Sequence, residues 1–87
     1  MRDIDQIIAE LSQEHPEIAV RQLEVTHPGV DDDGIWFFTY PGRLEEVQLE
    51  SSSGALPFLI ESNYASVYSA RTVKDAVVQV ANRLGLP

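Results

Sequence analysis

GIWFFTYPGRLEEVQLESSSG, residues 34–54, is the stretch of the sequence that decides the fold. Residues 35–40 hold the only Trp and a dense run of aromatic side chains, which β-strands favour. Pro41 and Gly42 follow, and this pair is typical of a turn. The second arm, residues 43–50, alternates acidic or amide side chains with aliphatic ones. The stretch therefore predicts a β-hairpin.

The register of this hairpin depends on its turn. We expect residues 41–42 to form the tip, with Tyr40 opposite Arg43 and Trp36 opposite Val47. A three-residue loop is the alternative, and it would flip one arm relative to the other, because strand side chains alternate with a period of two. In the expected arrangement one face carries Trp36, Phe38, Val47 and Leu49, and the other carries Ile35, Phe37, Glu46, Gln48 and Glu50.

Two amphipathic helices flank the predicted strands. Residues 3–14 place apolar side chains at the i, i+3, i+4 and i+7 positions of one stripe, with Asp3 as the expected N-cap. Residues 72–84 keep the same period, and their Thr-x-x-Asp beginning is a helix start signal. Gly85 and Leu86 fit a Schellman cap at the end of this second helix. Each helix therefore has one face to bury.

Further strands are predicted at residues 18–27 and 57–62. In the first of these, the apolar residues change parity near Arg21, which indicates either that the strand starts there or that it contains a bulge. Residues 63–71 form either a loop or a short strand. The sequence thus predicts one α+β domain over residues 1–87. Its order is α-β-β-β-β-α, with two helices packed on one face of a four-stranded, mainly antiparallel sheet.

Composition and charge restrict the classes of partner. The chain has 87 residues, 44% of them hydrophobic, and a net charge of −8 from 14 acidic and 6 basic residues. This balance opposes binding to nucleic-acid phosphates and to anionic membranes, and it favours a basic protein partner. There is no Cys, which excludes disulfides and thiolate catalysis. No apolar run approaches the ~20 residues of a membrane span, and we expect a cytoplasmic protein.

Recognisable catalytic motifs are absent from the sequence, so we expect neither enzymatic activity nor a cofactor. The acids on the predicted strands could act as general acids or bases, but alternating strand acids usually form the solvated side of a sheet. His27 lies near the acidic run 31–33, which suggests a metal site as one interpretation. This run lacks the spacing of a calcium loop, and we favour a solvated turn and no metal.

The main functional hypothesis concerns the sheet face that the helices leave open. There Ile35, Phe37 and Leu59 are expected to form an apolar strip ringed by carboxylates. Exposed apolar patches with charged rims are typical of interaction surfaces, and the acids would attract a basic partner. The predicted partner-binding residues are Glu24, Ile35, Phe37, Glu46, Glu50, Leu59 and Glu61.

Two alternatives remain open. One is a small-ligand-binding or enzyme-accessory domain that uses Trp36, Tyr40, Tyr64 and Arg71. The other is a homodimer in which a second copy of the chain covers the open face.

The stretch GALPFLIES, residues 54–62, followed by a helix that begins at Thr72, resembles small single-domain α+β proteins of bacteria. This resemblance covers most of the chain and implies a fold without implying an activity. In size, acidity and element order the chain is also similar to immunity proteins that neutralise bacterial toxins. That second resemblance is architectural only, implies an antitoxin-like binding role, and transfers no functional residue.

Overall fold

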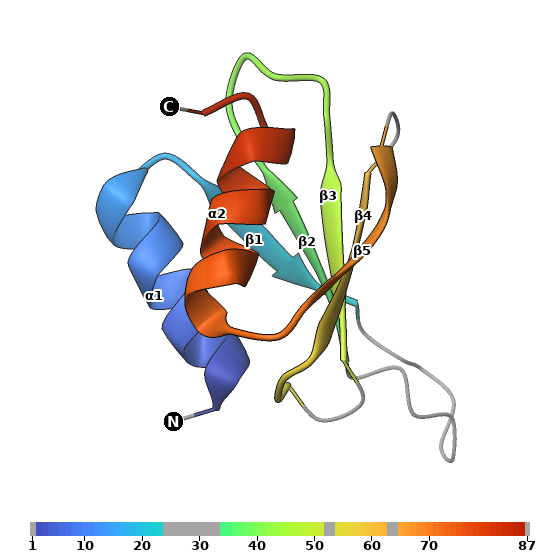
Figure 1. Cartoon of the computed structure of the whole chain (residues 1–87). Helices are drawn as coiled ribbons and strands as arrows, with labels where there is room; N and C mark the ends of the chain where they lie inside the picture. The colour runs from blue at the N-terminus through green and yellow to red at the C-terminus, as the bar shows by residue number, and fades with distance from the viewer. Residues whose placement is uncertain (1, 24–33, 52–53, 63–64, 87) are drawn as a thin grey trace.

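The computed structural model of the chain describes residues 2–23, 34–51, 54–62 and 65–86. The elements follow the chain order α-β-β-β-β-β-α, with one helix before the strands and one after them (Figure 1). The elements are α1 (Asp3–Glu14), β1 (Ala19–Gln22), β2 (Ile35–Thr39), β3 (Val47–Glu50), β4 (Phe58–Ser62), β5 (Ala65–Ala70) and α2 (Val73–Arg83).

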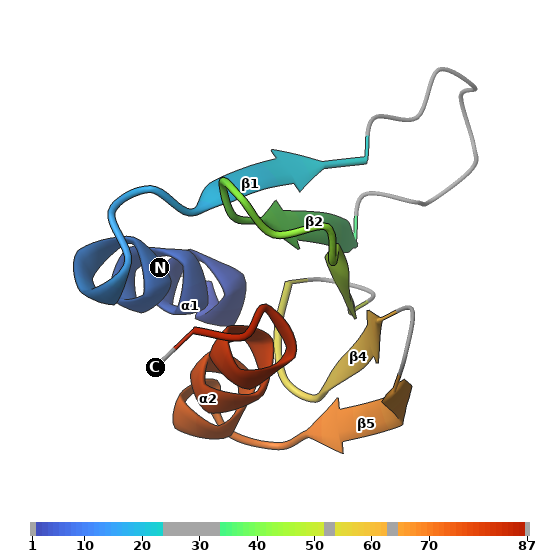
Figure 2. The ribbon, with the colours of Figure 1, turned by 90° about the horizontal axis from the view of Figure 1, so that it is seen from above.

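The strands form one antiparallel sheet in the order β1-β2-β3-β4-β5, so each strand pairs with its neighbours in sequence. Both helices lie on the same side of this sheet, α1 beside β1 and α2 beside β5, and no helix of the described residues lies on the other side (Figures 1 and 2). The α+β class and the placement of the helices agree with the sequence. The expected number of four strands is wrong, because residues 65–70 form a fifth strand at the sheet edge.

The expected pairing of the central hairpin is also wrong, by two residues. Trp36 lies opposite Leu49 rather than Val47, and Val47 lies opposite Phe38. Pro41 and Gly42 form a turn closed by the Arg43 N–H and the Tyr40 carbonyl at 3.0 Å, with φ of +80° at the glycine. A turn with a positive φ only at its third residue does not match the twist of paired strands, so the ladder begins further back. A shift of two residues preserves parity, so the predicted faces are confirmed.

Strand β1 is shorter than the predicted strand 18–27, of which residues 24–27 lie outside the described residues. It starts at Ala19 rather than near Arg21, and Val20 pairs with Phe38. Ile18 and Val20 pack against the core, which places Arg21 on the opposite side of the sheet.

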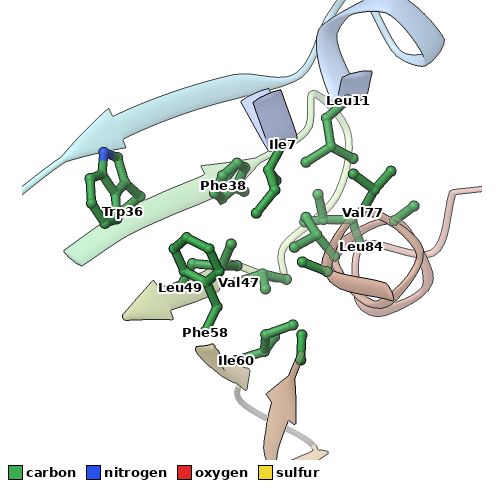
Figure 3. Packing of buried hydrophobic residues seen from close by; sticks show 14 of the residues in the cluster. Ile7, Leu11, Trp36, Phe38, Val47, Leu49, Phe58, Ile60, Val77 and Leu84 are labelled. Atoms are coloured by element: carbon green, nitrogen blue, oxygen red, sulfur yellow. The ribbon is translucent and has the colours of Figure 1, made fainter. Parts of the chain in front are cut away.

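The core fills the space between the sheet and the two helices (Figure 3). Alternate residues of β2, β3 and β4 point into it, and the apolar stripes of α1 and α2 close it from the other side. Ten of its largest side chains are fully buried: Phe38, Phe58, Ile4, Ile7, Leu11, Leu49, Ile60, Leu84, Val47 and Val80.

The helix ends are held by local hydrogen bonds. Helix α2 has the predicted caps: the Asp75 N–H donates to Thr72 Oγ1 at 3.0 Å, and the Leu86 N–H donates to the Ala81 carbonyl at 2.9 Å beyond Gly85. Helix α1 begins differently from the prediction, because Arg2 is its N-cap. Asp3 instead accepts the Leu56 N–H at 2.9 Å and ties the helix start to the chain before β4.

Replacing Phe38 by Ala tests the central place of β2 in this core. Phe38 is fully buried, so we expect Phe38→Ala to lower the free energy of unfolding by about 3–5 kcal/mol through the cavity it creates. Leu44 in the β2–β3 loop is 98% exposed, and Leu44→Ala should change that free energy by less than about 0.5 kcal/mol. Urea unfolding measures both variants, and equal losses would contradict the core described here.

A hydrogen bond between Tyr68 and Asp75 joins strand β5 to helix α2 at 2.7 Å. This bond to a carboxylate raises the pKa of the Tyr68 phenol above its ordinary value of 10.0. The stabilisation that it supplies is therefore complete below pH 10.0 and is lost as the pH rises through the higher pKa of the folded state. The difference in tyrosinate absorbance between wild type and Tyr68→Phe should titrate with a midpoint above 10.0; a midpoint at or below that value would contradict the bond.

Candidate interaction surface on the helix-free face of the sheet

The strand residues that alternate with the core residues point to the side of the sheet that carries no helix. We call this surface the open face. Phe37 and Ile35 on β2 are half-buried there, and Leu59 on β4 is 43% exposed. The open face consists of Arg21, Ile35, Phe37, Glu46, Gln48, Glu50, Leu59, Glu61 and Ser69.

Strand pairing arranges these side chains in two rows across the sheet. The first row runs Arg21, Phe37, Gln48, Glu61, and the second runs Ile35, Glu50, Leu59, Ser69. Six of the seven predicted partner-binding residues therefore share one face, while Glu24 lies outside the described residues. They do not form the expected apolar strip with a carboxylate rim, because β3 passes between β2 and β4. Glu50 on β3 separates Ile35 from Leu59, so apolar and acidic side chains alternate.

Arg21, which was not among the predicted site residues, places a positive charge on the open face. Its guanidinium carbon lies 4.5 Å from the centre of the Phe37 ring, and its Nη2 lies 3.7 Å from Glu46 Oε2. The two charged side chains are 63% and 44% exposed, so water screens their attraction. The change of parity at residues 18–21 was the signal for this placement, since Ile18 and Val20 turn inward and Arg21 turns outward.

Two shallow hollows flank Phe37. One, of about 200 Å³, lies toward β1 and is lined by Ala19, Val20, Arg21, Phe37, Thr39 and Glu46. The other, of about 140 Å³, lies toward β4 and is lined by Phe37, Glu46, Gln48, Glu61 and Ser62. Both are smaller than the ~300–1,000 Å³ typical of small-molecule pockets, and their size suits single side chains. An aromatic ring beside carboxylates favours cationic groups.

The residues of the alternative ligand site do not come together. Trp36 is 3% exposed and packs edge-on against Phe58 in the core, with ring centres 6.5 Å apart. Tyr40 packs edge-on against His15 at 6.4 Å. Arg71 follows the far end of β5, at the end of the sheet opposite Tyr40, because β2 and β5 run in opposite directions. Tyr64 lies outside the described residues.

Within residues 2–23, 34–51, 54–62 and 65–86 no three His, Asp or Glu side chains gather as metal ligands would. His27 and the acidic run 31–33 lie outside these ranges. Neither described helix is both long and apolar enough to span a bilayer.

Comparison with known proteins identified no relative. No family model matches the chain, and neither a curated protein nor a solved structure matches it. The candidate site therefore rests on the geometry of this chain alone.

Removing the Arg21 side chain tests whether this residue is needed for the stability of the fold or only forms part of the open face. Because Arg21 and Glu46 are largely exposed, we expect Arg21→Ala to lower the free energy of unfolding by less than about 1 kcal/mol in urea. Lys74→Ala, an exposed basic residue on α2, is the matched control. A loss of roughly 3 kcal/mol or more at Arg21 alone would assign this residue to the fold instead.

Proposed function

We propose that the chain is a non-enzymatic protein-interaction module that binds a basic segment of a partner protein through its open face. One observation carries the proposal. The face without helices places a half-buried aromatic ring, Phe37, among the carboxylates of Glu46, Glu50 and Glu61. Aromatic anchors surrounded by polar side chains are typical of binding surfaces, and the carboxylates supply attraction for cations.

The contacts of Arg21 support the chemistry that we assign to the partner. This guanidinium stacks over Phe37 and approaches Glu46 on the β1 side of the ring. The hollow on the β4 side offers the same ring, the other side of Glu46, and in addition Glu61. A partner arginine or lysine that entered this second hollow would repeat the contacts that Arg21 makes in the first.

An antitoxin-like or immunity-like role in the cytoplasm is the form of this proposal that the acidity and the element order favour. Proteins that neutralise basic toxins gain speed of encounter from an acidic surface. The net charge of −8 and the three carboxylates of the open face support such a role.

Charge reversal on the open face tests the proposal. We expect the double variant Glu50→Lys/Glu61→Lys to lose capture of a basic protein from lysate of the source cell. The affinity should fall by roughly tenfold or more, because the new lysines would repel a basic partner. The matched control Glu14→Lys/Glu17→Lys makes the same change in net charge on α1 and the turn that follows it, away from the sheet face. Capture by the wild type should weaken as salt is added.

The pair of variants separates specific binding from general charge attraction. A basic protein retained by wild type and by the α1 variant, but lost in the sheet variant, supports the open face as the binding site. Equal loss of capture in both variants would mean that binding depends on net charge alone, without a specific site. Undiminished capture by Glu50→Lys/Glu61→Lys would reject the proposal. Phe37→Glu should likewise abolish capture, whereas Val78→Glu, on the exposed side of α2, should preserve it.

A further inference from the structure

Strand β5 forms one edge of the sheet. It is the last strand in the order, and among the described residues only β4 pairs with it (Figure 2). Residues 66–69 are all exposed, with Val67 at 57% and Tyr68 at 36%. The pairing with β4 is regular from Tyr68 to Ala70, and it shifts register between Ile60 and Ser62. An edge strand presents unpaired N–H and C=O groups along its free side.

Strand β5 has one device that protects a sheet edge, the register shift near its N-terminal end, where Arg83 also donates to the Ser66 carbonyl, but it lacks the others. Natural edges are blunted by charged side chains, by Pro or by being very short. Strand β5 reads ASVYSA over six residues, with no charge and no Pro. The opposite edge, β1, has four residues and includes Arg21. The contrast marks β5 as the edge that can accept another strand.

The part of the chain around β5 is poor in acidic side chains, so two copies that meet there keep most of their negative charge apart. Residues 62–87 carry one acidic side chain against three basic ones, whereas residues 1–61 carry thirteen acidic against three basic. The basic residues of the C-terminal part are Arg71, Lys74 and Arg83. Arg83 donates to the Ser66 carbonyl at 2.6 Å and to Ser62 Oγ at 3.0 Å, so it borders the edge itself.

We infer that two copies of this chain associate through their β5 edges, antiparallel, into one continuous sheet. A two-fold axis perpendicular to the sheet generates this arrangement and keeps both helix layers on one side. With the axis near Val67, this exposed β-branched side chain meets its equivalent in the second copy, and such cross-strand pairs stabilise sheets. The inference does not depend on the proposed function, although it would place both open faces side by side and offer a partner two sites.

The ends of β5 are complementary in charge under this symmetry. Arg71 directly follows the C-terminal end of the strand, and Glu61 on β4 lies beside the N-terminal half of β5, between Ile60, which pairs with Tyr68, and Ser62, which pairs with Ala65. Antiparallel pairing brings the end of one β5 beside the start of the other, so each Arg71 approaches Glu61 of the second copy. Within one copy, neither residue forms an ion pair with another described residue.

Light scattering on the full chain tests the inference through the mass in solution. We expect the wild type to reach twice its monomer mass of 9.7 kDa as concentration rises. Val67→Lys adds a charge at the edge and should raise the dimer dissociation constant by roughly tenfold or more. Leu44→Lys, the same kind of change in an exposed loop, should leave it unchanged. Circular dichroism confirms that each variant is folded.

Two further comparisons identify the interface. Arg71→Glu should weaken the dimer a few-fold, and Arg71→Glu combined with Glu61→Arg should restore it, because the exchanged charges attract again. A wild type that stays monomeric at every concentration overturns the inference. A dimer that survives Val67→Lys but dissociates in Phe37→Glu also overturns it, because the open face would then be the interface.

Discussion

The structure depends on the burial of one sheet face beneath two amphipathic helices. Every second residue of β2, β3 and β4 must turn toward α1 and α2, and those residues are the large apolar ones, with Phe38 and Phe58 fully buried at the centre. Because strand side chains alternate strictly, the same constraint determines which residues point away from the helices. Phe37, Gln48 and Glu61 lie on the open face because their neighbours in sequence are needed in the core.

The open face has features that a sheet face exposed only to solvent would not need. Phe37 is an aromatic ring placed between carboxylates, and the chain's own Arg21 stacks on it. In this contact the ring and Glu46 together hold a guanidinium, and a second hollow of similar kind lies on the other side of the ring. The sheet edge at β5 is chemically different, because it is uncharged and bordered by basic residues. The molecule therefore offers an acidic face and a neutral edge, suited to two different kinds of contact.

The helices and the faces of the central strands could be predicted from the sequence, since periodicity and caps are local signals. The predicted bounds of α1 match, and Thr72 and Gly85 mark the ends of α2. The register of the hairpin could not be predicted, because the Pro-Gly turn does not continue the ladder. Strand β5 gave no clear signal, because an edge strand exposed on both faces lacks the apolar alternation of a half-buried one. The contacts of Arg21 with Phe37 and Glu46 were not predicted, because they depend on which strand pairs with β1.

The most direct test of the central claim, that the open face binds cationic protein segments, is an NMR titration of the isotope-labelled chain with an arginine-rich peptide. The account predicts shifts of backbone amides along β2, β3 and β4, greatest around Phe37, Gln48 and Glu61, and little change on α1 despite its exposed acids. Shifts centred on α1, or spread evenly over all acidic residues, would contradict it, because attraction would then follow charge alone and no surface would be specific.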